Sequence, residues 1–350
     1  MKLTFKNDTF KILQIADTQE GRKVSPDTLA LINAALDREE PDLVVYSGDQ
    51  IWGRGFHGDV NQVRRVLKEL TAPVVERHLP FAICFGNHDR QVGLDNRAQF
   101  EIYKEIPGFI GEDTPGVDGV GNYTVAVKNS RGAVTQALFF TDTGSYVDGD
   151  YLGFMWKYDG MHQNQMDWYR GEVEALTAHN RALGAPMTKS LMFFHIPIAQ
   201  YKTAWEAYKE NGYKDTGEVQ VHYGGIGEKG GLFPSLHPDH VFDTLQQVGS
   251  TRGTFCGHDH LNNLSVTYKG IRLTYGLSVD YLAYIGIKNY GAQRGFTRIT
   301  VRPDGSFDCQ PVSYYQKPFW NGEEQVQMTP YYPPEKNPNA YPADYKAPIA

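Results

Sequence analysis

The sequence predicts a mixed α/β fold of four layers (α/β/β/α), with two mixed β-sheets face to face and helices on both outer faces. Three short apolar runs, Phe10–Ala16, Leu43–Tyr46 and Leu79–Phe85, alternate with helical patterns, which is typical of parallel strands joined by crossover helices. Four later apolar runs follow one another without helices between them, which favours antiparallel pairing. We expect one domain over residues 1–316 and a Pro- and Tyr-rich tail at residues 317–350.

The helices are predicted from their caps and apolar stripes. Pro26 follows a capping Ser25, and Leu29, Ile32 and Leu36 then recur at helical spacing. Further helices are expected at Val60–Leu70, Arg97–Ile106, His162–Leu183, Ala199–Glu210 and Pro238–Val248.

The later strands are predicted from shorter patterns. Tyr123–Lys128 and Ala133–Thr141 flank a turn at residues 129–132 and are expected to form a hairpin. The Gly-rich stretch Asn211–Phe233 is too long for a plain connection, so we expect a lid or pocket wall there. The remaining strands are expected at Lys189–His195, Gly253–Cys256, Leu264–Tyr268, Ile271–Tyr275, Phe296–Val301 and Phe307–Val312.

Composition narrows the class of protein. The 350 residues are 41% hydrophobic with a net charge of −7 and show no basic run, so we expect no nucleic-acid partner. No apolar run reaches the ~18 residues of a membrane span, and no membrane association is expected. The three widely spaced cysteines and the charged N-terminal residues, which leave no signal-peptide core, predict a cytoplasmic protein without a disulfide framework.

Clusters of polar residues follow five of the predicted strands. They are Asp17-Thr18-Gln19, Gly48-Asp49, Gly86-Asn87-His88-Asp89, His195 and Gly257-His258-Asp259-His260. Each cluster alone has an ordinary explanation, such as a helix cap or a core histidine. Five in this order, each ending an apolar run, indicate a shared site, because ligands gather at the carboxyl ends of parallel strands. Carboxylates, an amide and imidazoles together suit Mn, Fe or Zn.

This set resembles the calcineurin-like metallophosphoesterase superfamily, whose pattern is D-x-H, G-D, G-N-H-D/E, H and G-H-x-H. The match runs from about Lys11 to Tyr275. The region from Tyr275 to Arg294 further resembles a single-domain branch of purple-acid-phosphatase-like proteins. The resemblance implies a hydrolase of phosphoric esters with two metal ions, one bridging hydroxide that attacks phosphorus, and a phosphate-ester substrate.

The resemblance also implies roles for individual residues. The ligands would be Asp17, Gln19, Asp49 and His260 for the first ion, and Asp49, Asn87, His195 and His258 for the second. His88 would assist the leaving group and Asp89 would orient the His88 ring and raise its pKa; His88 as a local hydrogen-bond partner is the alternative. Asp259 either caps its turn or holds a ligand imidazole.

One position departs from the pattern, since Gln19 stands where the family usually has His. An amide oxygen is a weaker ligand, so the first site would prefer Mn or Fe(II) or lose its metal easily; alternatively Gln19 does not coordinate. For substrate binding the candidates are Arg54, Arg90, His222 and Tyr223. The two arginines are suited to phosphate oxygens, although solvated surface positions explain them equally well, and loop packing explains His222 and Tyr223.

Three functions remain open. A phosphomonoesterase is the leading expectation, a phosphodiesterase using the same site is the second, and a scaffold of the same fold without catalysis is the third. Gln19 favours the scaffold, whereas the intact Asn87, His88, Asp89 and histidine ligands favour an enzyme.

Overall fold

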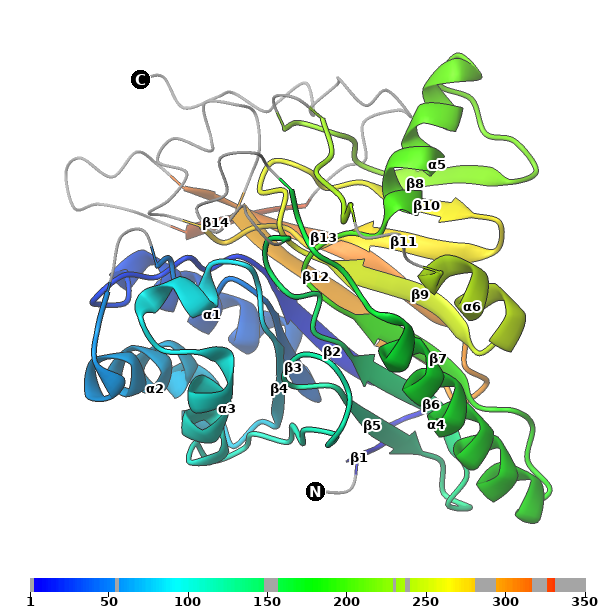
Figure 1. Cartoon of the computed structure of the whole chain (residues 1–350), viewed down its shortest axis with the longest axis horizontal. Coiled ribbons are helices and arrows are strands. Elements are labelled where there is room, and N and C mark those ends of the chain that lie inside the picture. Colours follow the sequence, from blue (N-terminus) through cyan, green and yellow to red (C-terminus); the bar gives the residue numbers. More distant parts are fainter. Residues whose placement is uncertain are drawn as a thin grey trace.

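The computed structural model describes residues 3–53, 57–147, 157–228, 231–236, 240–280, 294–316 and 326–330. Within them the strands form two sheets that face each other, with α1, α2 and α3 on one side and α4, α5 and α6 on the other (Figure 1). The four-layer α/β prediction is therefore confirmed. No helix in these ranges has the length and apolarity needed to cross a membrane.

The smaller sheet carries the first parallel strands of the chain. Its order is β14 (Val326–Pro330), β13 (Phe307–Gln316), β12 (Arg294–Val301), β2 (Phe10–Ile15), β3 (Leu43–Ser47) and β4 (Phe81–Cys84). As predicted, β2, β3 and β4 are parallel and β12 is antiparallel to β13. Strand β14 lies within residues 317–350 and pairs with β13; the division of the chain at residue 316 stays a prediction.

The larger sheet is mixed. Its order is β1 (Leu3–Thr4), β5 (Tyr123–Lys128), β6 (Val134–Phe140), β7 (Lys189–Phe193), β9 (Thr251–Cys256), β11 (Ile271–Tyr275), β10 (Ser265–Tyr268) and β8 (Val219–Tyr223). The predicted hairpin is present as antiparallel β5 and β6. One expectation was wrong in part, because β11 is parallel to β9 rather than antiparallel throughout. The stretch expected to be a loop also contains β8, whose Val219, Val221 and Tyr223 alternate toward the interior.

The helices begin and end close to the predicted residues, with one clear difference. They are α1 (Pro26–Glu39), α2 (Val60–Glu76), the 3₁₀ turn η1 (Asp89–Val92), α3 (Asn96–Lys104), α4 (Gln163–Ala182), α5 (Ala199–Glu210) and α6 (Val241–Val248). Helix α2 continues past Pro73 because its buried stripe goes on to Val74.

The core between the sheets contains a row of stacked rings. Phe140 packs face to face with Tyr123 at 4.7 Å between ring centroids, Phe193 with Phe140 at 5.2 Å, and Phe255 with Phe193 at 5.1 Å. The rings come from β5, β6, β7 and β9, so they join neighbouring strands of the larger sheet on its inner face. A second apolar cluster packs α4, α5 and α6 against the outer face.

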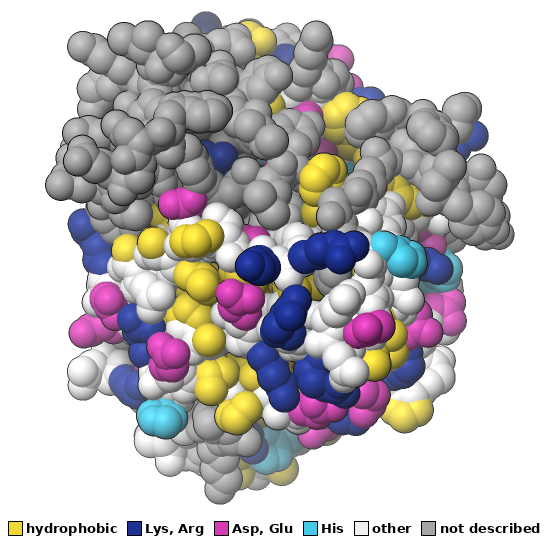
Figure 2. All heavy atoms as spheres, turned by 90° about the vertical axis from the view of Figure 1, so that its left-hand side faces the viewer, with side chains coloured by type: hydrophobic (Ala, Val, Ile, Leu, Met, Phe, Trp, Pro, Cys, Tyr) yellow, Lys and Arg dark blue, Asp and Glu magenta, His cyan; other side chains and the backbone are white. Residues whose placement is uncertain are grey.

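Figure 2 shows the face on the α1 and α2 side of the molecule. Lys and Arg side chains gather near its middle, with Asp and Glu side chains beside them. On these helices Arg64 forms an ion pair with Glu105 at 3.0 Å, and Arg77 with Asp37 at 2.6 Å. Part of the basic charge is therefore neutralised by neighbouring acids.

Candidate metal centre

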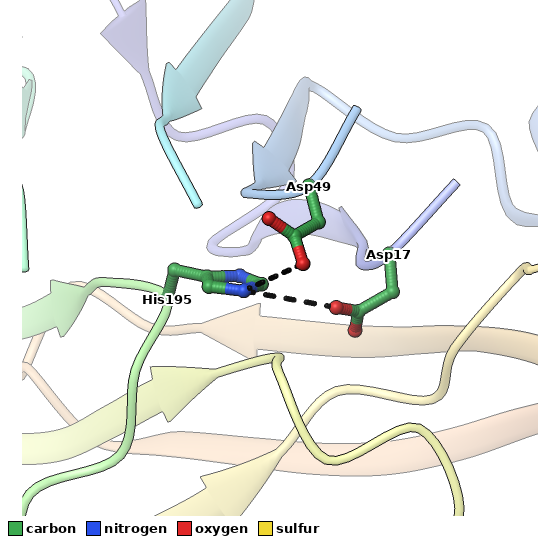
Figure 3. Close-up of side chains that lie close together, drawn as sticks. All are labelled: Asp17, Asp49 and His195. Carbon is green, nitrogen blue, oxygen red and sulfur yellow. Dashed lines mark ion pairs between the residues drawn. The ribbon is translucent and has the colours of Figure 1, made fainter. Parts of the chain in front are cut away.

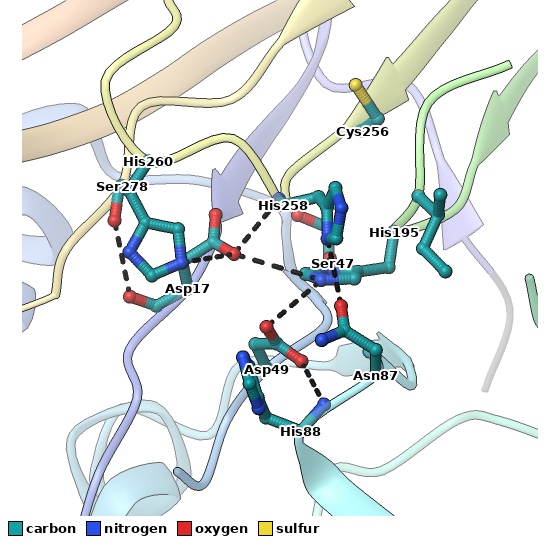
Figure 4. Close-up of polar contacts among 12 residues, drawn as sticks. Asp17, Ser47, Asp49, Asn87, His88, His195, Cys256, His258, His260 and Ser278 are labelled. Atoms are coloured by element: carbon teal, nitrogen blue, oxygen red, sulfur yellow. Dashed lines mark hydrogen bonds and ion pairs between the residues drawn. The ribbon is translucent and has the colours of Figure 1, made fainter. Parts of the chain in front are cut away.

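The polar clusters lie where strands of both sheets end. Asp17, Asp49 and Asn87 follow β2, β3 and β4 in the smaller sheet, and His195 and His258 follow β7 and β9 in the larger one. The sheets meet at this edge, since His195 Nδ1 lies 2.9 Å from the Ser47 carbonyl oxygen. The structure thus brings together segments more than 240 positions apart in the chain, since the His258 N–H donates to Asp17 Oδ1 across 241 positions (Figure 4).

The backbone is strained at these positions. Asp17, Gln19, Asp49 and His258 all have positive φ, between 51° and 81°, a region that residues other than glycine seldom adopt. Such strain concentrates at functional sites, where the surrounding structure holds it in place. In addition, a Cβ at Gly86 would lie 2.1 Å from Asp49 Oδ1, so only glycine lets this loop approach the carboxylate.

Asp49 lies at the centre of the cluster. Its Oδ1 accepts the His88 N–H at 2.8 Å, and its Oδ2 accepts from Gln19 Nε2 at 2.8 Å. The same Oδ2 is 3.2 Å from His195 Nε2. Asp17 Oδ1 is 3.9 Å from that nitrogen (Figure 3). Asp17, Asp49 and His195 therefore offer ligand atoms that all lie within 4.8 Å of one another.

Two further groups complete the cluster on opposite sides. His260 Nε2 lies 3.7 Å from Asp17 Oδ1 and 3.4 Å from Gln19 Nε2. On the other side, Asn87 Oδ1 lies 2.8 Å from His258 Nδ1. All seven residues expected as ligands are thus assembled at one place, and each is at most 9% exposed.

Three buried atoms in this cluster have no hydrogen-bond partner. They are Asp17 Oδ2, Gln19 Oε1 and His195 Nε2. Buried polar atoms are normally paired, because an unpaired one costs about 1–3 kcal/mol. A bound cation would satisfy all three, and the set of carboxylate, amide and imidazole donors fits Mn, Fe or Zn. The residues present therefore fit a metal centre.

Charges in the cluster depend on one another. Burial raises the pKa of Asp17 to about 6. Burial also opposes the charge of Asp49, but His195 and His88 outweigh it and lower the Asp49 pKa. Burial likewise opposes charge on His260, yet Asp17 and Asp280 raise the His260 pKa to about 10. The carboxylates thus stabilise positive charge on the imidazoles beside them.

The structure corrects the expected partnership of His88 and Asp89. His88 Nδ1 lies 2.7 Å from Gln91 Oε1, so Gln91 orients the ring. Asp89 instead accepts three backbone N–H groups, from Gly86 (2.7 Å), Asp49 (2.9 Å) and Ile51 (3.0 Å). Burial lowers the pKa of His88, where a rise was expected. The prediction was wrong because η1 turns the Asp89 carboxylate toward the backbone of the Asp49 loop.

The substrate candidates are scattered. Arg54 lies outside the described residues. Arg90 is exposed and lines a surface cavity of about 390 Å³ together with Asp142 and His162. His222 and Tyr223 lie on β8, three strand spacings or about 14 Å from β9.

Their contacts are local to that edge of the sheet. Tyr223 is buried with Arg272 over its ring, and His222 Nε2 lies 2.7 Å from Thr267 Oγ1. A substrate role for these residues stays a prediction. Asp259, the ambiguous position, accepts from Tyr275 Oη at 2.7 Å and from the Phe233 N–H at 3.2 Å. These contacts are with segments distant in the chain and correspond to neither expected alternative.

Several residues around the centre were not anticipated. Asp280 Oδ2 lies 2.8 Å from His260 Nδ1, Tyr146 Oη accepts from Asn87 Nδ2 at 3.2 Å, and the Tyr158 ring meets the His258 ring edge-on at 4.2 Å. Gln91 had a detectable signal, since residues three apart meet in a helical turn. Asp280 and the two tyrosines come from distant segments, and nothing in the sequence indicated that they would contact the ligands.

Known proteins resemble this chain along most of its length. The sequence model of the calcineurin-like phosphoesterase family matches residues 10–262. The chain is 25% identical to "Probable inactive purple acid phosphatase 14" of Arabidopsis thaliana, over 81% of this chain and 74% of that protein. It is 28% identical to "Phosphatase DCR2" of Saccharomyces cerevisiae, over 76% of this chain and 47% of that protein. Its fold is similar to that of a dimetal phosphatase from Danio rerio, with a TM-score of 0.58, 13% identity, and coverage of 91% and 98% of the two chains.

Proposed function

Because the chain belongs to the calcineurin-like phosphoesterase family, a family of hydrolases of phosphoric esters, we propose that it is a metal-dependent phosphomonoesterase. One observation carries the proposal. Seven potential ligands from both sheets meet in a buried cluster, and three of their atoms lack any hydrogen-bond partner. No structural need explains three unpaired polar atoms in one place.

The cluster divides into two sets of ligands around Asp49. Asp17, Gln19 and His260 lie on one side of it. The other side holds Asn87, His195 and His258. We infer that each set would hold one Mn, Fe or Zn ion and that Asp49 would contribute to both. When bound, the ions would supply an activated water and positive charge for the phosphoryl group.

The protein's own side chains prepare this chemistry. His195 Nδ1 must carry its hydrogen because its partner, the Ser47 carbonyl, can only accept. The lone pair of Nε2 is therefore aimed at the centre. Gln91 Oε1 accepts from His88 Nδ1, so Nε2 of His88 would donate to the leaving oxygen or to the phosphoryl group when the ring is protonated at both nitrogens. Asp89 fixes the loops that carry Asp49 and His88.

Two alternatives share this site. A phosphodiesterase would use the same centre, and relatives named as phosphatases favour the monoester. A scaffold without catalysis is supported by Gln19 and by the Arabidopsis relatives, whose names call them probably inactive. In the scaffold the cluster would bind metal without turning over an ester.

One experiment distinguishes the phosphomonoesterase, the phosphodiesterase and the non-catalytic scaffold. The protein is loaded with Mn, Fe or Zn and assayed on p-nitrophenyl phosphate beside bis(p-nitrophenyl) phosphate. We expect the monoester to react faster and Asp49→Asn to abolish activity, while the control Glu39→Gln, at another buried carboxylate outside the ligand set, retains it. Faster reaction of the diester would overturn the monoester assignment, and bound metal without turnover of either ester would establish the scaffold.

A further inference from the structure

A buried carboxylate outside the ligand set contacts one of the ligands. Asp280 follows β11 and is fully buried, with its Oδ2 2.8 Å from His260 Nδ1. Its contact is on the opposite side of the His260 ring from Nε2, the nitrogen that lies near Asp17 and Gln19. Figure 4 shows the His260 ring beside Asp17.

The segment that carries Asp280 is joined to the strand that carries Asp17. The Val279 N–H donates to the Ala16 carbonyl at 3.0 Å, and Ser278 Oγ donates to the Asp17 carbonyl at 3.4 Å. Arg294 Nε donates to the Asp280 carbonyl at 2.7 Å. The Asp280 carboxylate is therefore held at a fixed position relative to Asp17, as a residue that orients a ligand must be.

The chemistry of the contact decides which nitrogen of His260 is free. A carboxylate only accepts hydrogen bonds, so the partner nitrogen Nδ1 carries the hydrogen. The lone pair is then on Nε2, which faces the cluster. A carboxylate behind a ligand imidazole also increases the basicity of the ring, and loss of such a partner lowers metal affinity by about 10–100-fold.

We propose that Asp280 is a positioning residue that sets the affinity of the first metal site. This inference rests on the proposed function, because it takes the metal centre as given. The first set has a single imidazole, from His260, beside its amide, whereas the second set has two imidazoles beside its amide, so the first site depends more on the orientation of its one histidine. The second site relies instead on a neutral backbone partner, the Ser47 carbonyl behind His195. The histidine ligands of the two sites are thus oriented by partners of different charge, a carboxylate for His260 and a neutral carbonyl for His195.

The test is a two-site titration with Mn²⁺ by calorimetry, with electron paramagnetic resonance reporting whether the ions are coupled. Asp280→Asn preserves shape without the charge, Asp280→Ala removes the contact, and Glu39→Gln, at a buried carboxylate outside the ligand set, is the control. We expect both Asp280 variants to weaken one Mn²⁺ by about 10–100-fold, to leave the other unchanged, and to lose the coupled signal at limiting metal.

Other results would overturn the inference. Unchanged Mn²⁺ affinities in both Asp280 variants would contradict the role of Asp280 and leave the proposed metal centre unaffected. Equal weakening of both ions, with a lower melting temperature of the metal-free protein, would show a merely structural role. A wild type that binds no Mn²⁺ would overturn the proposed function as well.

Discussion

Asp89 is predicted to stabilise the loops of the centre. In Asp89→Asn the amide oxygen can take the place of Oδ2 and keep the Gly86 and Asp49 N–H groups. The amide nitrogen then faces the Ile51 N–H, which loses its acceptor. One buried unpaired donor costs about 1–3 kcal/mol. We expect Asp89→Asn to lose this much free energy of unfolding in urea denaturation.

The matched control is Asp95→Asn, at the N-cap of α3. Asp95 is exposed and accepts one N–H, from Ala98 at 2.8 Å, which the Asn oxygen can still accept, so this variant is expected to stay within about 0.5 kcal/mol of wild type. The reasoning would be refuted if Asp89→Asn matched the wild type in stability while losing turnover. That result would place Asp89 in the chemistry.

Three further predictions concern the core, pH and metal affinity. Phe193→Ala, which removes the middle ring of the stack between Phe140 and Phe255, should cost about 3–5 kcal/mol of unfolding free energy. Phe193→Leu should be much milder because it keeps most of the buried volume, and equal losses would contradict this explanation. Partial burial opposes a charge on His162, but Asp118 and Asp159 raise its pKa, so its stabilisation is present below pH 6.5 and fades as pH rises through the folded pKa. The melting temperatures of wild type and His162→Gln should therefore converge toward alkaline pH, and a constant difference would refute this. Gln19→His should tighten one Zn²⁺ by about tenfold, because imidazole suits zinc better than an amide oxygen does; an unchanged Zn²⁺ titration would mean that Gln19 does not coordinate.

Much of the site could be predicted from the sequence because it is built at strand ends. A buried strand is recognisable from its apolar run, and the residues just after it are then fixed in space. Asp17, Asp49 and Asn87 lie together because β2, β3 and β4 are parallel neighbours. His195 and His258 lie beside them because the two sheets face each other. This proximity follows from the overall fold and cannot be predicted from the local sequence pattern.

The contacts and the strand that the sequence did not predict also have physical explanations. Asp89 follows His88 directly in sequence, yet neighbouring side chains in a 3₁₀ turn point apart, so Gln91 contacts the ring instead. Strand β8 was missed because its pattern is only five residues long and lies in a Gly-rich stretch. Asp280 contacts His260 through tertiary packing, and no spacing between residues in the sequence predicts such a contact.

The central claim is that the cluster around Asp49 binds two metal ions. Anomalous X-ray diffraction from crystals soaked in Mn²⁺ tests it most directly. The account predicts two peaks about 3.5–4 Å apart, one on each side of the Asp49 carboxylate, and their loss in Asp49→Ala. A well-ordered cluster without a peak at saturating Mn²⁺, or peaks only elsewhere on the protein, would contradict it.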